Sequence, residues 1–408
     1  MSYSKVNYNQ NNSSNPGRKR VQHSKHKYHN QSRPAKKAST LDPSLLVKEA
    51  DHSAKEKVFR SDRMVSELPI DKKLKQALDS KGYERPTEIQ DRTLETLLAG
   101  NDLLGIAQTG TGKTGAFLIP IIEQLLHRRQ SRYALIVVPT RELALQVEEE
   151  FISMTKGLGL YSSCFIGGTN INRDLQNLRR NSHVVIATPG RLLDLTDRRA
   201  LDLGKFKTLV LDEFDRMLDM GFIRDVNRIL EGMQGRSHTM LFSATLDKSQ
   251  QTLINSILKQ PVTVKVSAGN STGDGIDQEV IKVKPGEDKF KILHKMLSQN
   301  EFNKVLLFEE TKHRVSRLCG KLNKAGIRAE QIHGNKSQNA RQNALKAFKQ
   351  GRVRVLVATD VASRGLDITD VSHVINYQVP QTHDSYIHRI GRTGRAGKVG
   401  KAYTFVAN

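Results

Sequence analysis

Short apolar runs alternate with longer amphipathic stretches along most of the chain. A first set of runs rich in Val, Ile and Leu predicts β-strands over residues 103–106, 133–139, 161–166, 183–188, 208–211 and 239–242. Apolar residues spaced three and four apart predict helices between most of them, the clearest over 112–127, 142–155 and 175–180. Strands that alternate with helices form a parallel sheet covered on both faces. The pattern therefore predicts an α/β domain.

The same alternation begins again after a polar break. Residues 267–277 (SAGNSTGDGID) contain three glycines and no apolar period, which predicts a flexible linker. Beyond it we expect strands over 280–283, 305–308, 329–333, 353–358, 374–376 and 403–406, with helices over 289–297, 314–322 and 341–348. The chain is thus expected to hold two α/β domains, residues 64–266 and 278–408, that close on a ligand.

Residues 1–63 show no apolar period that would build a core, and they are expected to form a disordered basic tail. Nine of the 65 Lys and Arg residues lie in the first 40 positions, which contain no Asp or Glu. Lysines and arginines that pair with phosphates, and tyrosines that stack on bases, are typical of an arm that binds single-stranded nucleic acid. A nuclear-import signal at residues 17–20 (GRKR) and a merely solvated tail are the alternatives.

The net charge of +23 favours a polyanionic partner, either nucleic acid or an anionic membrane surface. No run approaches 18 apolar residues and the N-terminus is polar, so we expect neither a transmembrane helix nor a secretory signal. Cys164 and Cys319 are far apart and lie in apolar patterns, which indicates reduced thiols in a reducing compartment.

A glycine-rich stretch follows the first predicted strand. Residues 107–114 read AQTGTGKT, close to the G-x-x-x-x-G-K-[ST] loop whose backbone N–H groups surround a polyphosphate. Lys113 is expected to reach the β- and γ-phosphates and Thr114 a magnesium ion, at the positive end of the following helix. The expected phosphate-binding residues are Ala107, Gln108, Thr109, Gly110, Thr111, Gly112, Lys113 and Thr114. Ala107 stands where the pattern has glycine, and a chance Gly/Thr-rich turn is the alternative.

A carboxylate cluster follows the predicted strand 208–211. Asp212 is expected to hold the metal and Glu213 to orient or deprotonate the attacking water, as Mg-nucleotide hydrolysis requires. A solvated acidic turn is the alternative. Ser243 and Thr245, after the next strand, are candidates to bond Asp215 and relay the nucleotide state.

These motifs occur in the order and spacing of the DEAD-box RNA helicase family, which the chain resembles from about residue 65 to its end. The set is AQTGTGKT, PTRELALQ (139–146), GG (167–168), TPGR (188–191), DEFD (212–215), SAT (243–245), ATDVASRGLDI (358–368) and HRIGRTGR (388–395). The resemblance implies two tandem RecA-like domains, each a mainly parallel sheet flanked by helices. It also implies ATP and Mg²⁺ as cofactors and RNA as partner.

The resemblance implies further site residues. Gln90 would read adenine and Asp367 would meet the ribose, while Arg392 and Arg395 would act as arginine fingers on the transferring phosphoryl group. His388 would bridge to Asp215. The implied contacts with the RNA backbone, which do not read sequence, come from Arg141, Gly168, Thr188, Arg191, Arg341, Thr359 and Arg364.

Two positions depart from the family pattern. Phe214 replaces a small alanine beside the metal site, and Val65 stands where the family usually has a phenylalanine against adenine, with Phe59 as a nearby substitute. Because the last predicted strand ends close to residue 408, we expect no C-terminal accessory domain, which leaves targeting to the tail.

The sequence predicts an RNA-dependent ATPase that binds single-stranded RNA and locally unwinds short duplexes. The alternative is an ATP-gated RNA clamp or annealing chaperone, in which Phe214 and Val65 weaken hydrolysis and the basic tail does most of the binding. A DNA translocase is disfavoured, because the motif set resembles RNA enzymes. The expected location is the bacterial cytoplasm, with a eukaryotic nucleus as the minority view.

Overall fold

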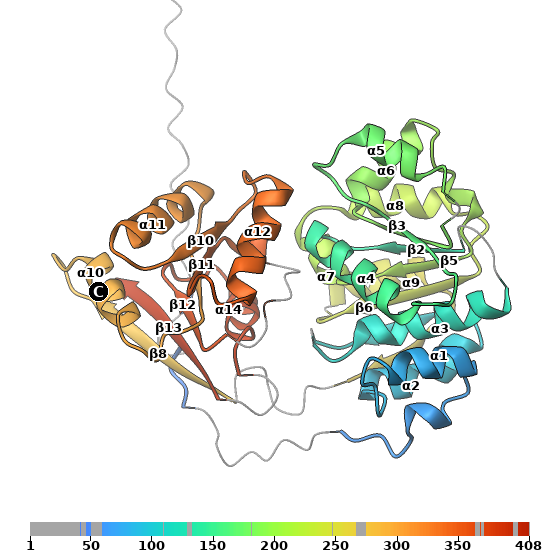
Figure 1. Ribbon diagram of the computed structural model, residues 1–408, viewed down its shortest axis with the longest axis horizontal. Coiled ribbons are helices and arrows are strands. Elements are labelled where there is room, and N and C mark those ends of the chain that lie inside the picture. The colour runs from blue at the N-terminus through green and yellow to red at the C-terminus, as the bar shows by residue number, and fades with distance from the viewer. Residues whose placement is uncertain are drawn as a thin grey trace, which may run out of the picture. The chain divides into compact units, whose positions relative to one another are not determined.

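The computed structural model describes residues 41, 46–49, 59–108, 110–128, 133–180, 182–246, 248–266, 275–363, 368, 371–394 and 399–407 (Figure 1). The described part carries two parallel sheets, as the sequence pattern predicts. Within it, no helix is both long and apolar enough to cross a membrane.

The first sheet has the strand order β3-β4-β2-β5-β6-β1-β7, and its paired strands are parallel. Its strands are β1 (Leu103–Ile106), β2 (Ala134–Val137), β3 (Ser162–Phe165), β4 (Val184–Ala187), β5 (Thr208–Leu211), β6 (His238–Ser243) and β7 (Val262–Lys265). Strand β7 was not predicted. Its VTVK sequence buries Val264 among the core residues of the domain and leaves Val262 exposed, as expected for a strand at the edge of a sheet.

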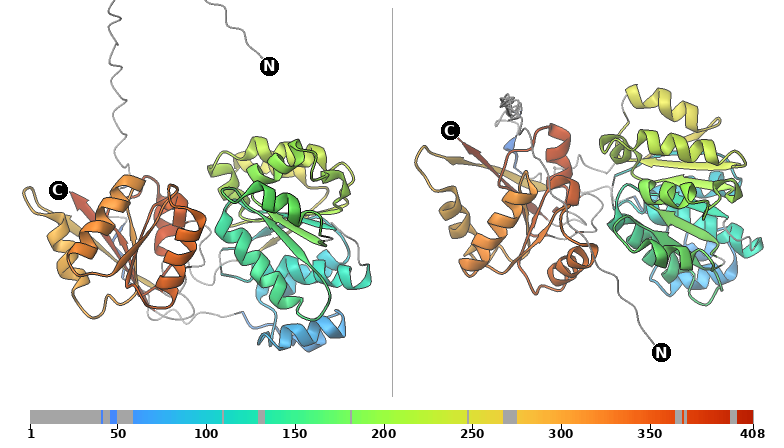
Figure 2. Two further views of the ribbon diagram at one scale, coloured as in Figure 1. Left: turned by 45° about the horizontal axis from the view of Figure 1, so that its top comes forward. Right: turned by 90° about the horizontal axis from the view of Figure 1, so that it is seen from above.

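Helices cover both faces of this sheet (Figures 1 and 2). The domain contains η2 (Val65–Glu67), α1 (Lys72–Asp79), α2 (Glu88–Leu98), α3 (Lys113–His127), α4 (Arg141–Met154), α5 (Ile171–Asn177), α6 (Pro189–Asp197), η3 (Leu203–Lys205), α7 (Phe214–Asp219), α8 (Ile223–Gly232) and α9 (Lys248–Ile257). Neighbouring strand residues point to opposite faces: Ile136 packs in the core under α1 to α4, and Val137 packs in the core under α6 to α9. This two-sided burial explains why the strands read as continuous apolar runs.

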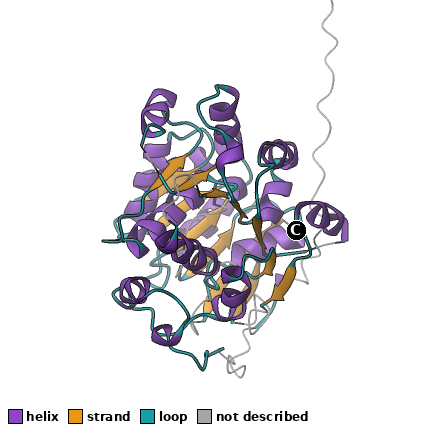
Figure 3. Cartoon of the chain, turned by 90° about the vertical axis from the view of Figure 1, so that its right-hand side faces the viewer, coloured by secondary structure: helices purple, strands orange, loops and turns teal. Residues whose placement is uncertain are grey.

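The second sheet has the order β10-β11-β9-β12-β13-β8, again with parallel pairs. Its strands are β8 (Ile276–Val283), β9 (Val305–Phe308), β10 (Ala329–Ile332), β11 (Val355–Ala358), β12 (His373–Asn376) and β13 (Gly400–Ala407). The helices are α10 (Lys289–Leu297), α11 (Lys312–Lys324), α12 (Gln338–Lys349), α13 (Asp360–Ser363) and α14 (His383–Ile390). Helices α10 and α11 pack on one face, and α12 and α14 on the other. In Figure 3 the strands, in orange, lie between helices, in purple.

Strand β8 begins earlier than the sequence indicates. It starts at Ile276, inside the predicted linker, and pairs along its length with β13. Ile276 is buried in the core although the residues before it are small and polar. Pairing with β13, together with burial of the Ile276 side chain, forms a strand where the local pattern predicts none.

We predicted a disordered tail through residue 63, but two short stretches of it, residues 46–49 and 59–63, pack on the folded domains. Leu46 is fully buried in the core of the second domain, and Lys48 exchanges two backbone hydrogen bonds with Gln278 of β8, of 3.1 and 2.7 Å. Ser61 and Arg63 pack instead on α2 of the first domain. The rest of the predicted tail, residues 1–40, 42–45 and 50–58, lies outside the described residues, as do residues 267–274 of the linker.

Candidate functional site

The phosphate loop lies between the end of β1 at Ile106 and the start of α3 at Lys113, as predicted. Gly112 caps the helix with φ of 94°, a left-handed conformation that favours glycine. The Lys113 side chain is buried, and its Nζ donates a 2.8 Å hydrogen bond to the carbonyl oxygen of Ala107. A buried ammonium and the N-terminus of a 15-residue helix therefore meet at one loop, an arrangement suited to phosphate.

Ala107, at the position of the first glycine in the general loop pattern, packs into the core. Its backbone N–H donates to the Ser243 carbonyl oxygen over 3.0 Å, which ties the loop to β6. Thr111 closes the loop by donating from Oγ1 to the Gln108 carbonyl oxygen over 2.8 Å. Thr114 is half-buried in the first turn of α3. Thr109 lies outside the described residues.

Gln90, predicted to read adenine, lies directly against the phosphate loop. Its Nε2 donates to the Gly112 carbonyl oxygen over 3.1 Å, and its Oε1 accepts from the backbone N–H of Thr87 over 3.0 Å. A Cβ atom at Gly112 would lie 2.5 Å from Thr87 Oγ1 and 2.8 Å from Gln90 Nε2. Glycine is therefore required here by both its φ and its neighbours. The contact with adenine remains a prediction.

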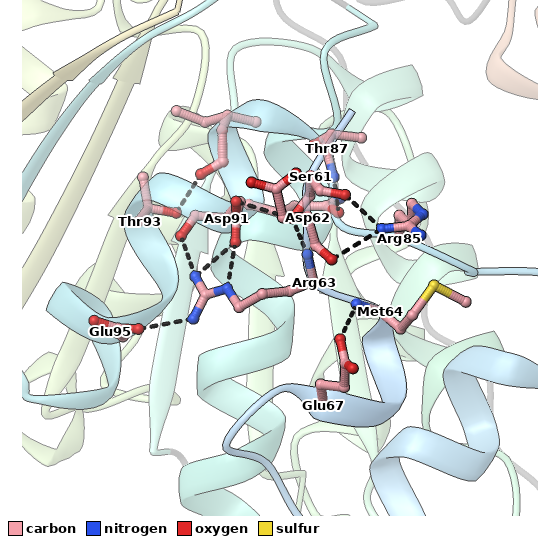
Figure 4. Close-up of polar contacts among 12 residues, drawn as sticks. Ser61, Asp62, Arg63, Met64, Glu67, Arg85, Thr87, Asp91, Thr93 and Glu95 are labelled. Atoms are coloured by element: carbon pink, nitrogen blue, oxygen red, sulfur yellow. Dashed lines mark hydrogen bonds and ion pairs between the residues drawn. The ribbon is translucent and has the colours of Figure 1, made fainter. Parts of the chain in front are cut away.

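A network around Arg63, which no sequence motif indicated, fastens the segment before α1 to the helix that carries Gln90 (Figure 4). Arg63 forms ion pairs with Asp91 at 2.6 Å and Glu95 at 2.8 Å, both on α2. Ser61 Oγ donates to Asp91 over 3.0 Å, and Arg85 donates to the Ser61 carbonyl oxygen over 2.6 Å. Asp91 follows Gln90 directly, so the network holds the first turns of α2.

Val65, the residue in the place of the family's phenylalanine, is buried in the core of the first domain. Its backbone N–H donates to the Glu84 carbonyl oxygen over 2.9 Å. Phe59 is 40% exposed, so its ring does not take over a core position.

Strand β5 delivers Asp212 to the carboxyl edge of the first sheet, where the phosphate loop also lies. Burial raises the pKa of Asp212 to about 6, while the nearby Lys113 ammonium opposes that rise and the Glu213 carboxylate adds to it. One carboxylate oxygen accepts the Glu213 backbone N–H over 2.9 Å. No group of three or more His, Cys, Asp or Glu side chains forms a metal site among the described residues. A magnesium ion here would take ligands from Asp212, from Thr114 and from phosphates and water, as this cation commonly does.

Glu213 is held in an uncommon conformation. Its φ is 52°, in the left-handed region that non-glycine residues rarely adopt. Its buried carboxylate pairs with the buried guanidinium of Arg216 at 2.8 Å, one turn along α7. Sequence reasoning missed Arg216, although its spacing of three residues from Glu213 in a helix was a usable signal.

The predicted relay residues lie together in part. Thr245 Oγ1 donates to Asp215 Oδ2 over 3.3 Å, whereas Ser243 Oγ donates to the Thr245 carbonyl oxygen over 2.6 Å. Ser243 thus supports Thr245 rather than bonding Asp215 itself. The bridge from His388 on α14 to Asp215 remains a prediction.

The Phe214 side chain lies in the core of the first domain. Its ring is fully buried in the core beneath α6 to α9. The large side chain is therefore accommodated by core packing.

In the first domain, the predicted RNA-contacting residues Arg141, Gly168 and Thr188 lie at the ends of neighbouring strands. Arg141 begins α4, and its guanidinium covers Gly168: a Cβ atom there would lie 2.3 Å from Arg141 Nη1. Gly168 also has φ of 80°. Thr188 Oγ1 accepts the backbone N–H of Gly167 over 3.3 Å, and α6 begins at the next residue. Arg141 and the start of α6 together form a surface that suits a phosphate backbone.

Arg191 is bonded to other residues of the first domain. Its guanidinium is buried, pairs with Asp174 at 2.5 Å and donates to the Thr169 carbonyl oxygen over 2.7 Å. These bonds connect α6 to α5 and to the loop before α5. Arg191 thus holds this loop in place. Its contact with RNA remains a prediction.

In the second domain, Arg341 and Thr359 lie near the carboxyl ends of β10 and β11. Arg341 on α12 is buried, and its Nη2 lies 3.0 Å from Glu142 Oε2 and 3.4 Å from the Ala362 carbonyl oxygen. Gln338 donates to the other oxygen of Glu142 over 3.0 Å. Burial lowers the pKa of Arg341, and the Glu142 carboxylate opposes that change. Glu142 was not singled out by sequence, although it follows Arg141 in the same motif.

Helix α14 carries His388 and leads to the buried Arg392. Between them, Arg389 forms a two-bond ion pair with Asp360 at 2.5 and 2.7 Å, and donates to Asn376 and to the Gln378 carbonyl oxygen. This arginine fixes α14 against the strand ends of the second sheet. Three other predicted site residues of this domain, Arg364, Asp367 and Arg395, lie outside the described residues.

Comparison with protein families gives two matches. The model described as "DEAD/DEAH box helicase" matches residues 87–253, and the model described as "Helicase conserved C-terminal domain" matches residues 288–397. Among curated proteins, the chain is 43% identical to the ATP-dependent RNA helicase CshA of Listeria monocytogenes, over 84% of the chain and 65% of the relative. It is 42% identical to the DEAD-box ATP-dependent RNA helicase CshA of Streptococcus pneumoniae, with the same coverage. The chain thus spans about 65% of the length of these relatives.

Solved structures show the same similarity. S. cerevisiae Dbp5 bound to RNA and ADP BeF3 matches with a TM-score of 0.75 at 31% identity, over 85% of this chain and 90% of that one. The DEAD-box helicase Mss116 bound to ssRNA and UDP-BeF also gives 0.75 at 31% identity, over 86% and 76%. The two sheets described above are thus tandem RecA-like domains.

Proposed function

The chain belongs to the DEAD-box helicase family, and from this membership we propose that it is an ATP-dependent RNA helicase. It would bind single-stranded RNA through the backbone, without reading sequence, and locally unwind short duplexes as ATP is hydrolysed between its two domains. The observation that carries the proposal is the meeting of Lys113, Asp212 and Glu213 at one edge of the first sheet.

The residues present fit a magnesium nucleotide. The phosphate loop has a glycine that tolerates no side chain, a buried lysine and a helix N-terminus. Asp212 is buried beside that lysine, so a cation there would offset the cost of its ionisation. Thr114 and Asp212 would hold Mg²⁺, and ATP would supply the phosphoanhydride whose hydrolysis releases energy.

The protein's own groups then have distinct tasks. Lys113 places positive charge against phosphate oxygens, and Glu213, fixed by Arg216, orients an attacking water and takes its proton. Arg392 and Arg395 would neutralise charge on the transferring group, and Gln90 and Asp367 would bind the base and the ribose. RNA would lie across Arg141, Gly168, Thr188 and Arg191 of the first domain and Arg341, Thr359 and Arg364 of the second.

The ATP-gated clamp is less well supported. It requires Phe214 to weaken catalysis, yet this ring is buried in the core. The two curated relatives named above carry helicase names. For location we propose the bacterial cytoplasm, because these relatives are bacterial.

Steady-state ATP hydrolysis with and without single-stranded RNA tests the proposal. We expect RNA to increase turnover, and Glu213→Gln to lower the stimulated rate by about 100-fold or more, the range of a general base. Glu231→Gln, an exposed substitution of the same type on α8, should leave the rate unchanged. Equal hydrolysis with and without RNA would refute the coupling. RNA binding with no stimulation would favour the clamp.

A further inference from the structure

Helices α10 and α11 of the second domain carry positive charge and no negative charge. Helix α10 contains three lysines, and α11 contains five Lys or Arg residues; neither contains Asp or Glu. The helices touch each other: His294 Nε2 lies 3.2 Å from the Ala325 carbonyl oxygen, and Lys321 Nζ lies 5.3 Å from the centre of the Phe290 ring. Their charges therefore lie on one side of the domain. The two helices, α10 and α11, can be seen on that side of the second sheet in Figures 1 and 2.

Four cations form a stripe along α11. Arg314, Arg317, Lys321 and Lys324 follow at intervals of three, four and three residues, so they lie on one face of the helix. All four are exposed. The buried seam of Val315, Leu318, Cys319 and Leu322 faces the sheet instead. With a rise of about 1.5 Å per residue, the stripe extends about 15 Å.

Little of this charge is neutralised within the protein. Among the described residues, the ion pair on the stripe joins Arg314 to Glu310 at 3.3 Å, and the two side chains are 51% and 26% exposed. Exposed pairs of this kind contribute about 0–1 kcal/mol and exchange readily with other partners. A row of four lysines and arginines that Glu310 neutralises only at its first position produces a positive potential.

The position of α11 relates the stripe to the predicted RNA-binding edge. Strands β9 and β11 are adjacent and parallel, with Phe308 paired to Ala358. Helix α11 begins four residues after Phe308, and Thr359 follows Ala358 directly. A strand of RNA that crosses this edge at Thr359 thus meets the start of α11 and can continue along it.

We propose that the stripe, with Lys291 and Lys295 of α10 beside it, is an additional binding surface for the phosphate backbone of RNA. This rests on the proposed function, since RNA is the ligand in both. An acidic protein fits less well: the large hydrophobic side chains found exposed in the described chain lie outside α10 and α11, so the face lacks the apolar anchors of protein interfaces. The surface would hold RNA beyond the segment contacted by the family motifs.

The test compares two quadruple variants with the native full-length chain. The stripe variant replaces four cations by Gln: Arg314, Arg317, Lys321 and Lys324. The control variant makes the same change in net charge at exposed positions of the first domain: Lys72, Lys73, Lys156 and Arg224. Dissociation constants for labelled single-stranded RNA of about 10 and about 30 nucleotides are measured by fluorescence anisotropy across a salt series.

We expect the stripe variant to bind the long RNA more weakly than the native chain. Each phosphate contact contributes about 0.7 to the magnitude of the slope of log affinity against log salt, so loss of four contacts should reduce that magnitude by about 3. Between about 50 and 200 mM salt, this difference in slope corresponds to about a 60-fold change in the ratio of the two affinities. Binding of the short RNA and the ATPase rate at saturating RNA should match the native values. The control variant should retain most of the slope.

Three results would overturn the inference. They are an unchanged slope for the stripe variant, an equal loss in the control variant, and an equal loss for short and long RNA. An unchanged slope would show that RNA does not use this face and would leave an acidic protein as the alternative partner. Far-UV circular dichroism and RNA-independent ATP hydrolysis check that each variant is folded. Failure of RNA to stimulate the native ATPase would refute the proposed function alone, because the binding comparison does not depend on hydrolysis.

Discussion

Replacing Arg389 by Met should strongly destabilise the second domain. The Arg389 side chain is only 4% exposed and makes two bonds to Asp360, one to Asn376 and one to the Gln378 carbonyl oxygen. Its guanidinium also lies 5.0 Å from the centre of the Phe308 ring. Met keeps part of the apolar stem but leaves these acceptors without their donor.

The expected loss follows from the burial of the pair. Removing one partner of a buried ion pair typically costs about 3–5 kcal/mol. Asp360 is 30% exposed, so water can solvate part of its carboxylate and the lower end applies, about 3 kcal/mol. Arg198→Met is the matched control, because Arg198 pairs with Asp194 at 2.7 Å while the two side chains are 52% and 41% exposed. That change should cost about 0.5 kcal/mol or less.

Urea unfolding, followed by far-UV circular dichroism, gives the comparison, since the chain contains no tryptophan. With a denaturant slope of about 2 kcal/mol per molar, Arg389→Met should move the midpoint of the second domain by about 1.5 M. Amide hydrogen exchange in β12 should increase in parallel, because Asn376 ends that strand. A shift as small as that of Arg198→Met would refute the reasoning. So would a large shift with no change of exchange in β12.

Three further predictions follow from other contacts. Arg63→Gln should raise KM for ATP up to about fivefold with kcat unchanged, because loss of a partly exposed ion pair costs about 1 kcal/mol. Arg92→Gln, on the helix α2 that carries the partners of Arg63, should leave KM unchanged, and steady-state kinetics would distinguish the two variants. Burial raises the pKa of Asp212 to about 6, so the contribution of this carboxyl group to stability is full below about pH 4 and is lost as the pH rises through 6. The unfolding midpoint of the nucleotide-free protein should therefore fall over this pH range, and that of Asp212→Asn should not. Equal pH profiles for the two proteins would contradict the prediction. Leu46→Ala should cost about 2–5 kcal/mol in denaturant unfolding and Val47→Ala, at a 59% exposed neighbour, about 0.5 or less; similar losses would show that Leu46 is not a core residue.

Much of the fold was predictable because it depends on local pattern. The apolar runs gave the central strands of both sheets, since strands buried on both faces must be apolar throughout. The glycine-rich loop could be placed for the same reason: Gly112 needs a left-handed backbone, and the strand and helix around it have their own local signals. The order and spacing of the motifs along the chain indicated the resemblance to the family.

Edge elements and segment boundaries were predicted less well. Strand β7 has one buried side chain, and β8 begins in a polar stretch, so neither shows a clear period before its partner strand is known. Leu46 and Lys48 look like part of a polar tail in the sequence. They join the second domain because the edge of β8 offers backbone partners and the core offers an apolar site.

The sequence by itself determined the two α/β domains and the types of residue that could bind phosphate, metal and RNA. Only the tertiary structure decided which charged groups pair. Arg63 with Asp91 and Arg389 with Asp360 are 28 and 29 residues apart, and Arg191 turned out to be bound to Asp174. The physical reason is that an ion pair acts over a few ångströms and depends on burial, and both are set only when distant segments have packed together.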